Sequence, residues 1–83
     1  MRPSLSLTDL ATGAHAIIAG VHGPEALGKR LNALGFSIGR RLCLVRRAGL
    51  GGPLHVRLGT TDVALRRTEA AGITVRLAEP EPA

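Results

Sequence analysis

Histidines are the residues of this chain whose chemistry first suggests a metal or catalytic site. His22 and Glu25 lie three residues apart at an expected helix start, where an imidazole and a carboxylate could share a divalent ion such as Zn or Fe. His55 is expected to face outward on a strand. Tetrahedral zinc takes four ligands, or three and a water, so a second molecule would have to supply the rest. The alternative is that these histidines are exposed and bind no metal, and we expect no required cofactor.

The patterns of nucleophilic and nucleotide-hydrolysing enzymes are missing from the sequence. None of the serines stands in a nucleophile-elbow context. The glycine-rich segment 49–52 lacks the Lys-Ser/Thr that a phosphate-binding loop requires. The single Cys43 excludes an intramolecular disulfide and a multi-cysteine zinc site, and we expect it on a strand, buried or half-buried. The sequence therefore predicts a protein that is not an enzyme and has no small-molecule substrate.

The charge of the chain is strongly basic. Its 83 residues include 11 Lys and Arg against 6 Asp and Glu, a formal net charge of +5. Such a surface suits an acidic protein, nucleic acid or an anionic membrane, although it also serves solubility alone. Nucleic acid is the weaker partner, because single-strand binders stack bases on aromatic rings and the chain has one Phe and neither Trp nor Tyr. Polyproline recognition is excluded for the same reason.

Short alternating segments indicate the elements that must position these residues. Apolar and polar residues alternate, as in strands with one buried face, in segments 14–19, 39–47, 54–58, 63–67 and 73–77. In the second segment Leu42 and Leu44 should face the core, with Arg47 on the other face. Short strands that close around a narrow core protect their edges. We expect a mainly β fold, a small barrel of about five strands in one domain of residues 1–78, with a disordered tail at 79–83.

Helical segments interrupt the strands early and late in the chain. Ser6 and Asp9 resemble a capping box at the start of a short helix, and a tight helical turn is expected at 68–72. A longer inserted helix should begin at Pro24 and pack one apolar face. The residues expected to hold this helix and its exit into the next strand are Leu27, Leu31, Leu34, Gly35, Phe36 and Gly39.

The loop between two central strands carries an isolated apolar residue. Leu50 stands among glycines, with Gly51 and Gly52 following it. An apolar side chain on such a loop could dock into a partner or a second copy of the chain, or it could fold back over the barrel edge. Arginines near the strand ends could form a basic face for an acidic partner or lipid head groups, or could be only solvated: Arg46, Arg47, Arg57, Arg66 and Arg67.

Several motifs, taken in order, resemble the family of ferrous iron transport protein A (FeoA). They are Leu7-Thr8-Asp9-Leu10 with Gly13, the Leu-Gly-Phe-x-x-Gly pattern within 31–39, the loop 48–54, Gly59-Thr60, the segment 63–70 and Ile73-x-Val75. The resemblance covers about residues 5–77. It implies an SH3-like β-barrel with an inserted helical region. It also implies a cytoplasmic accessory role beside FeoB, the membrane ferrous-iron transporter with a GTP-binding domain.

Three functions stay open at this point. The first is regulation of ferrous iron (Fe2+) uptake by contact with a FeoB-type transporter, which could hold the protein at the inner face of the plasma membrane. The second is a basic small barrel that binds nucleic acid. The third is a stand-alone regulator domain, because the same domain type occurs at the C-terminus of iron-dependent repressors. A homodimer is compatible with each of them.

Overall fold

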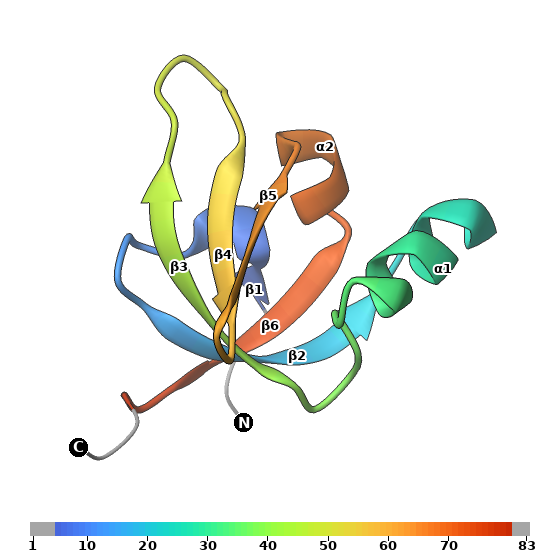
Figure 1. Ribbon diagram of the computed structural model, residues 1–83, viewed down its shortest axis with the longest axis horizontal. Helices are drawn as coiled ribbons and strands as arrows, with labels where there is room; N and C mark the ends of the chain where they lie inside the picture. The colour runs from blue at the N-terminus through green and yellow to red at the C-terminus, as the bar shows by residue number, and fades with distance from the viewer. Residues whose placement is uncertain (1–4, 81–83) are drawn as a thin grey trace.

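The computed structural model describes residues 5–80, which form one curled antiparallel sheet with small helices around it (Figure 1). The strands lie in the order β1-β6-β2-β3-β4-β5. The strands are β1 (Leu5–Ser6), β2 (His15–Val21), β3 (Arg41–Arg47), β4 (Leu54–Leu58), β5 (Thr61–Leu65) and β6 (Ile73–Ala78). The helices are η1 (Leu7–Asp9), α1 (Glu25–Ala33) and α2 (Arg67–Ala70). The mainly β prediction is confirmed.

The described residues form six strands rather than about five, because the sequence prediction missed β1. Leu5 lies opposite Val75 and Ser6 opposite Thr74 on the edge of β6. Two residues are too few to show alternation. The predicted helix start is nevertheless correct: the Ser6 hydroxyl accepts from the Thr8 N–H (3.2 Å), and the Asp9 carboxylate accepts from the Ser6 N–H (3.1 Å). This capping box holds η1 to a single 3-10 turn.

The turn between β4 and β5 is tighter than expected. It closes at Gly59-Thr60, where Gly59 has φ +62°. The following strand therefore begins at Thr61 and ends at Leu65, rather than running over 63–67. The next helix starts correspondingly early, at Arg67. A glycine in the left-handed region makes this short connection accessible without strain.

The end of α1 is built as the sequence predicted. Gly35 has φ +103°, its N–H donates to the Asn32 carbonyl (3.0 Å), and the Phe36 N–H donates to the Leu31 carbonyl (2.9 Å). This pair of bonds is the Schellman motif, in which an apolar residue at the position of Phe36 commonly accompanies one at the position of Leu31. Both side chains are buried. Leu34 is 39% exposed, so the prediction that it shares the buried face is wrong. The helix lies beside the sheet (Figure 1), and the chain reverses after Leu34, so that Phe36 reaches the core instead.

A bulge in β3 changes the face on which Arg47 lies. The pairing of β3 with β4 shifts register between Leu44 and Arg46, which leaves Val45 as the extra residue. Arg47 then lies opposite Leu54, whose side chain is buried. The prediction that Arg47 faces outward is wrong, because the bulge interrupts the alternation on which it depended. Leu42 and Leu44, which precede the bulge, face the core as predicted.

Apolar side chains from every strand fill the space inside the curled sheet. η1 closes one end of it with Leu7, and Leu10 follows directly. The fully buried side chains of greatest volume are Phe36, Leu7, Leu10, Ile18, Leu31, Leu42, Leu44, Leu54, Leu65, Ile73, Val56 and Val75. Each contributes about 1.5–3 kcal/mol by leaving water. Among residues 5–80, no helix has the length and apolar character that a membrane crossing requires.

The part of the chain expected to be a tail is described only in part. Glu79 and Pro80 follow β6, and the Glu79 carbonyl accepts a hydrogen bond from the Arg41 guanidinium. The remaining residues, 81–83, lie outside the described part of the chain, as do residues 1–4. The disordered tail stays a prediction.

Candidate functional site

The β3–β4 hairpin projects beyond the rest of the sheet (Figure 1). At its base the Ala48 N–H donates to the Pro53 carbonyl (3.0 Å). At its tip the Gly52 N–H donates to the Gly49 carbonyl (3.1 Å), which closes a four-residue turn. Gly52 is required by packing, since a Cβ there would lie 2.7 Å from the Cβ of Ala48. We call residues 48–53 the hairpin tip.

Leu50 is the central residue of this tip. It has φ +57°, and the next residue, Gly51, has φ +74°. Two consecutive positive φ angles are typical of a type I′ turn, whose twist matches that of the flanking strands. Leucine in the left-handed region costs about 1–2 kcal/mol. The Leu50 side chain has a relative exposure of 109%, so it does not fold back over the sheet edge. Strain and an open apolar side chain therefore coincide at one residue.

The predicted arginines are placed differently from one another. Arg46 lies exposed opposite His55, and Arg57 lies exposed opposite Cys43. These two share the outer face of the sheet, which is the face turned away from the core. Arg66 follows β5 directly and is exposed, and its backbone N–H donates to the carboxylate of Glu69 (2.9 Å). Arg46 and Arg57 thus form the part of the expected basic face that the sheet itself presents.

Arg47 binds within the molecule. Its guanidinium donates to the carbonyls of Thr8 and of Leu10, the latter at 2.6 Å. These carbonyls lie at the end of η1, where backbone acceptors lack helical partners. The side chain is half-buried and ties η1 to the end of β3. Its geometry is that of a structural residue.

Arg57 forms a two-point ion pair with Asp62 on the neighbouring strand. Nε donates to Oδ1 at 2.7 Å, and Nη2 donates to Oδ2 at 3.1 Å. The hydrogen bond from Arg57 holds the pKa of the Asp62 carboxyl below its usual value of 3.8, with a smaller contribution from charge attraction. Both side chains are exposed, and such pairs contribute little to stability. The pair does, however, fix the direction of the guanidinium.

The residues predicted to bind metal are not assembled into a site. The His22 backbone N–H donates to the Gly72 carbonyl (2.7 Å) at the end of β2, and Glu25 pairs with Lys29 (3.4 Å). His55 lies on the outer face of β4. Within residues 5–80 there is no group of three or more His, Cys, Asp or Glu side chains that could hold an ion. The donor set of one molecule therefore does not fit a metal centre.

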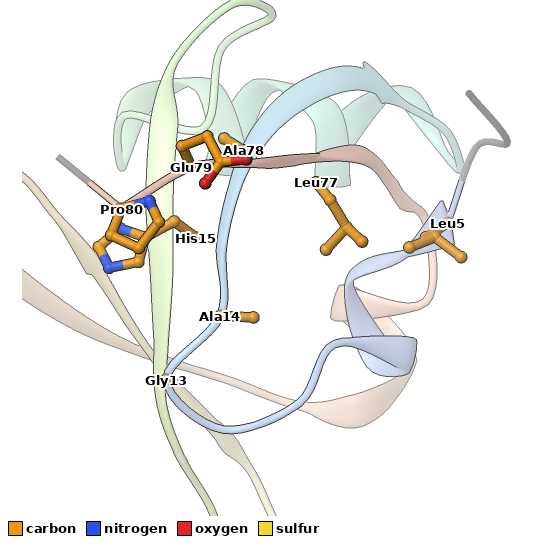
Figure 2. Close-up of a pocket in the computed structure, with 8 residues that line it drawn as sticks. All are labelled: Leu5, Gly13, Ala14, His15, Leu77, Ala78, Glu79 and Pro80. Carbon is orange, nitrogen blue, oxygen red and sulfur yellow. The ribbon is translucent and has the colours of Figure 1, made fainter. Parts of the chain in front are cut away.

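Sequence reasoning missed two hollows of the surface. The larger, about 460 Å³, lies between the start of β2 and the end of β6, and Ala14 and Leu77 point into it (Figure 2). The smaller, about 250 Å³, lies on the outer face near the start of β3. Each collects residues from segments far apart in the sequence, so the register between strands was the missing information. Only the cluster Arg40-Arg41 gave a local signal for the second hollow.

A protein-family model matches most of this chain. The model of the FeoA domain matches residues 5–77. A Fe(2+) transport protein A/Fe(2+) transporter FeoB fusion protein of Porphyromonas gingivalis is 37% identical over 73 residues. That stretch is 88% of this chain but 9% of the fusion protein, so the chain spans less than a tenth of the relative.

Two solved structures extend the comparison to the fold. The solution structure of the FeoA protein from Chlorobium tepidum is 33% identical with a TM-score of 0.84, covering 94% of this chain and 74% of that one. The crystal structure of Stenotrophomonas maltophilia FeoA complexed with zinc, described as an SH3 domain protein, is 33% identical with a TM-score of 0.74. It covers 86% of this chain and 88% of that one.

Proposed function

We propose that this chain, which belongs to the FeoA family, is an accessory protein that regulates a FeoB-type transporter by direct contact. The family is a group of small SH3-like domains associated with ferrous iron transport. The observation that carries the proposal is the homologue in which an FeoA domain and FeoB share one polypeptide. A tethered domain meets its neighbour at a high effective concentration. We propose that the domain in this chain makes the same contact through its own surface, on the cytoplasmic side of the membrane.

The hairpin tip is the contact that we propose on this chain. Burying the Leu50 side chain in a partner contributes about 1.5–3 kcal/mol. The tip is already closed by two hydrogen bonds, so little ordering entropy is lost on docking. Arg46 lies at the end of β3 beside the tip, and Arg57 follows on the same outer face. Their charge would steer the chain toward an acidic surface of the transporter.

Regulation follows from unequal binding. A bound domain changes the transport or GTP-hydrolysis equilibrium only if it binds one state of the transporter more tightly than another. The chain then needs no catalytic group and no metal of its own. This mechanism requires only that the chain has a rigid surface that fits one state of the transporter better than another. The curled sheet and its projecting hairpin supply such a surface.

Co-purification with the FeoB-type transporter of the same organism tests the proposal. We expect the native chain to bind the detergent-solubilised transporter, and Leu50→Asp to bind it at least about tenfold more weakly. The matched control is Ile38→Asp, because Ile38 is also exposed (72%) but precedes β3, at the opposite end from the tip. Failure of the native chain to bind would contradict the proposed function. Equal losses in the two variants would remove the hairpin tip from it.

A further inference from the structure

A hollow lined by basic side chains lies on the outer face of the sheet, at the end opposite to the hairpin tip. Its volume is about 250 Å³, and its lining residues are His15, Arg40, Arg41, Cys43, Arg57 and Gly59. We infer that this arginine hollow is a binding site for a phosphate group. Three arginines line it and no carboxylate does. The inference goes beyond the proposed transporter contact and does not depend on it.

The register of three strands builds the hollow. His15 of β2 lies opposite Cys43 of β3, and Cys43 lies opposite Arg57 of β4. Directly opposed residues on one face have Cβ atoms about 4.5–5.5 Å apart, so these side chains form a continuous row. Arg41 opens β3, and Gly59 follows the end of β4. The row forms the floor of the hollow, and these residues at the strand ends form its rim.

Arg57 is oriented by its ion pair with Asp62, and this pair does not use all of its N–H donors. Its pair with Asp62 uses Nε and one side of Nη2. A guanidinium carries five N–H donors in a fixed plane, so Nη1 and the second N–H of Nη2 are not engaged by this carboxylate. The pair therefore orients the guanidinium, while the negative charge of Asp62 offsets part of its positive field. A ligand that meets an oriented arginine loses less side-chain entropy on binding.

Arg40 completes the rim of the hollow. Its guanidinium passes close to two glycines: a Cβ added to Gly59 would lie 3.5 Å from Nη2, and one added to Gly35 would lie 3.6 Å from Nη1. The absence of side chains at these glycines leaves the arginine room to lie across the turn. Among the contacts of residues 5–80, the Arg40 side chain has no hydrogen-bond or ion-pair partner.

The chemistry of the lining selects phosphate among small anions. Guanidinium groups bind phosphate oxygens through paired, charge-assisted hydrogen bonds. Arg41 adds charge, while its Nη1 donates to the Glu79 carbonyl. Three arginines against the neighbouring Asp62 leave a positive local balance. The hollow is smaller than the usual site for a whole organic ligand, so it suits the phosphate end of a nucleotide or of a lipid head group.

Titration of the full chain with pyrophosphate, followed by amide chemical shifts at about 0.15 M salt, tests the site. We expect saturable shifts in residues of the hollow, and a loss of affinity of about tenfold or more in Arg40→Gln. Arg67→Gln removes the same charge from α2, outside the hollow, and should change the affinity less than about twofold. Equal losses would show diffuse attraction to a basic surface and would overturn the inference, as would an absence of saturable binding.

Cys43 offers a second pair of variants that does not touch an arginine. Cys43→Asp places a negative charge on the floor of the hollow and should abolish pyrophosphate binding, whereas Cys43→Ser should retain it. Unchanged binding in Cys43→Asp would contradict the site. Two further ligands identify the source of the phosphate. Tighter binding of GDP than of pyrophosphate would support a nucleotide, and co-sedimentation with phosphatidic acid vesicles but not phosphatidylcholine vesicles would support a lipid.

Discussion

Leu50 combines two features that stability alone would not favour. Its backbone lies in the left-handed region, and its side chain is fully open to water. Glycine or asparagine would adopt this conformation with less strain. Backbone strain at a residue whose side chain is open to water suggests that the side chain contacts another molecule. The proposal that Leu50 meets a partner rests on this combination.

Relief of the strain gives the first prediction. Leu50→Asn should stabilise the chain by about 0.5–1 kcal/mol, because asparagine tolerates positive φ. For a domain of this size the melting temperature should rise by several degrees, about 4–8 °C per kcal/mol. Leu50→Ala is the control: it removes the open side chain but keeps a Cβ at positive φ, so its melting temperature should stay near the native one. A melting temperature of Leu50→Asn at or below the native value would contradict the strain.

The Arg57–Asp62 pair gives a prediction about protonation. In Arg57→Gln the pKa of Asp62 should rise toward its usual value of 3.8, because the hydrogen bond that lowers it is lost. Carboxyl chemical shifts followed through an acid titration measure this directly. Arg46→Gln, on the same face but opposite His55, should leave the Asp62 titration unchanged.

The ion pair between Arg57 and Asp62 should also make the stability of the fold depend on pH. A carboxyl whose folded pKa is lowered stabilises the fold at pH values above its usual pKa, and the contribution is lost as the pH falls through the lowered value. Any advantage of the native chain over Arg57→Gln should therefore be present near neutral pH, begin to fall below about pH 4, and vanish once the pH is below the lowered pKa of Asp62. An advantage that grew as the pH fell would refute this assignment.

At the scale of elements, a close backbone approach joins β2 to β6. The His22 N–H donates to the Gly72 carbonyl (2.7 Å), and a Cβ on Gly72 would lie 2.2 Å from the His22 carbonyl oxygen. Gly72 thus has no room for a side chain. This contact fixes the point at which the chain leaves β2 for α1 and enters β6 from α2. Glu69 strengthens the same region through its ion pair with Arg30, which links α2 to α1.

Two glycine-to-alanine changes should act in opposite directions. Gly72→Ala should destabilise the chain by about 1–3 kcal/mol, since backbone must move to admit the methyl group. Gly28→Ala should stabilise it by up to about 1 kcal/mol, because Gly28 lies in α1 with nothing within 4 Å of the added Cβ. Urea unfolding of both variants measures the difference. Equal free energies of unfolding would show that neither the close approach nor the helix propensity matters here.

The elements differ in how far the sequence predicts them. The capping box of Ser6 and Asp9 and the helix end at Gly35 depend on bonds between residues a few positions apart, so they can be recognised in the sequence. The bulge at Val45 depends on the partner strand, and with it the inward position of Arg47. The exposure of Leu34 depends on where α1 lies against the sheet. Hydrogen bonds between residues close in the sequence can therefore be predicted from the sequence. The register between strands and the position of a helix on the sheet cannot.

The candidate sites also differ in how far the sequence predicts them. The hairpin tip was predicted from its composition, because an isolated leucine among glycines is visible in the sequence. The arginine hollow was not, because His15, Cys43 and Arg57 meet only through the pairing of β2, β3 and β4. The predicted metal ligands share no such pairing. Local composition can therefore point to a single candidate residue. A surface that spans several strands can be identified only once the fold is known.

The whole molecule separates its two proposed contacts. The hairpin tip projects from one end of β3 (Figure 1). The arginine hollow includes Arg40 and Arg41, at the other end of this strand. Arg57 belongs both to the proposed basic face and to the hollow, whereas Arg40 and Arg41 lie at the end of the hollow far from the tip. Leu50 belongs only to the first site and Arg40 only to the second, so variants at these two residues measure the two roles independently.

The binding constant of the full chain for its FeoB-type transporter, compared between native Leu50 and Leu50→Asn, separates a contact role of this residue from a structural one. We expect Leu50→Asn to be the more stable protein and yet to bind the transporter about tenfold more weakly. If Leu50 instead stabilised the fold, the substitution would lower both the stability of the chain and its affinity for the transporter. A Leu50→Asn chain that binds the transporter as tightly as the native chain does would show that Leu50 is not part of the contact.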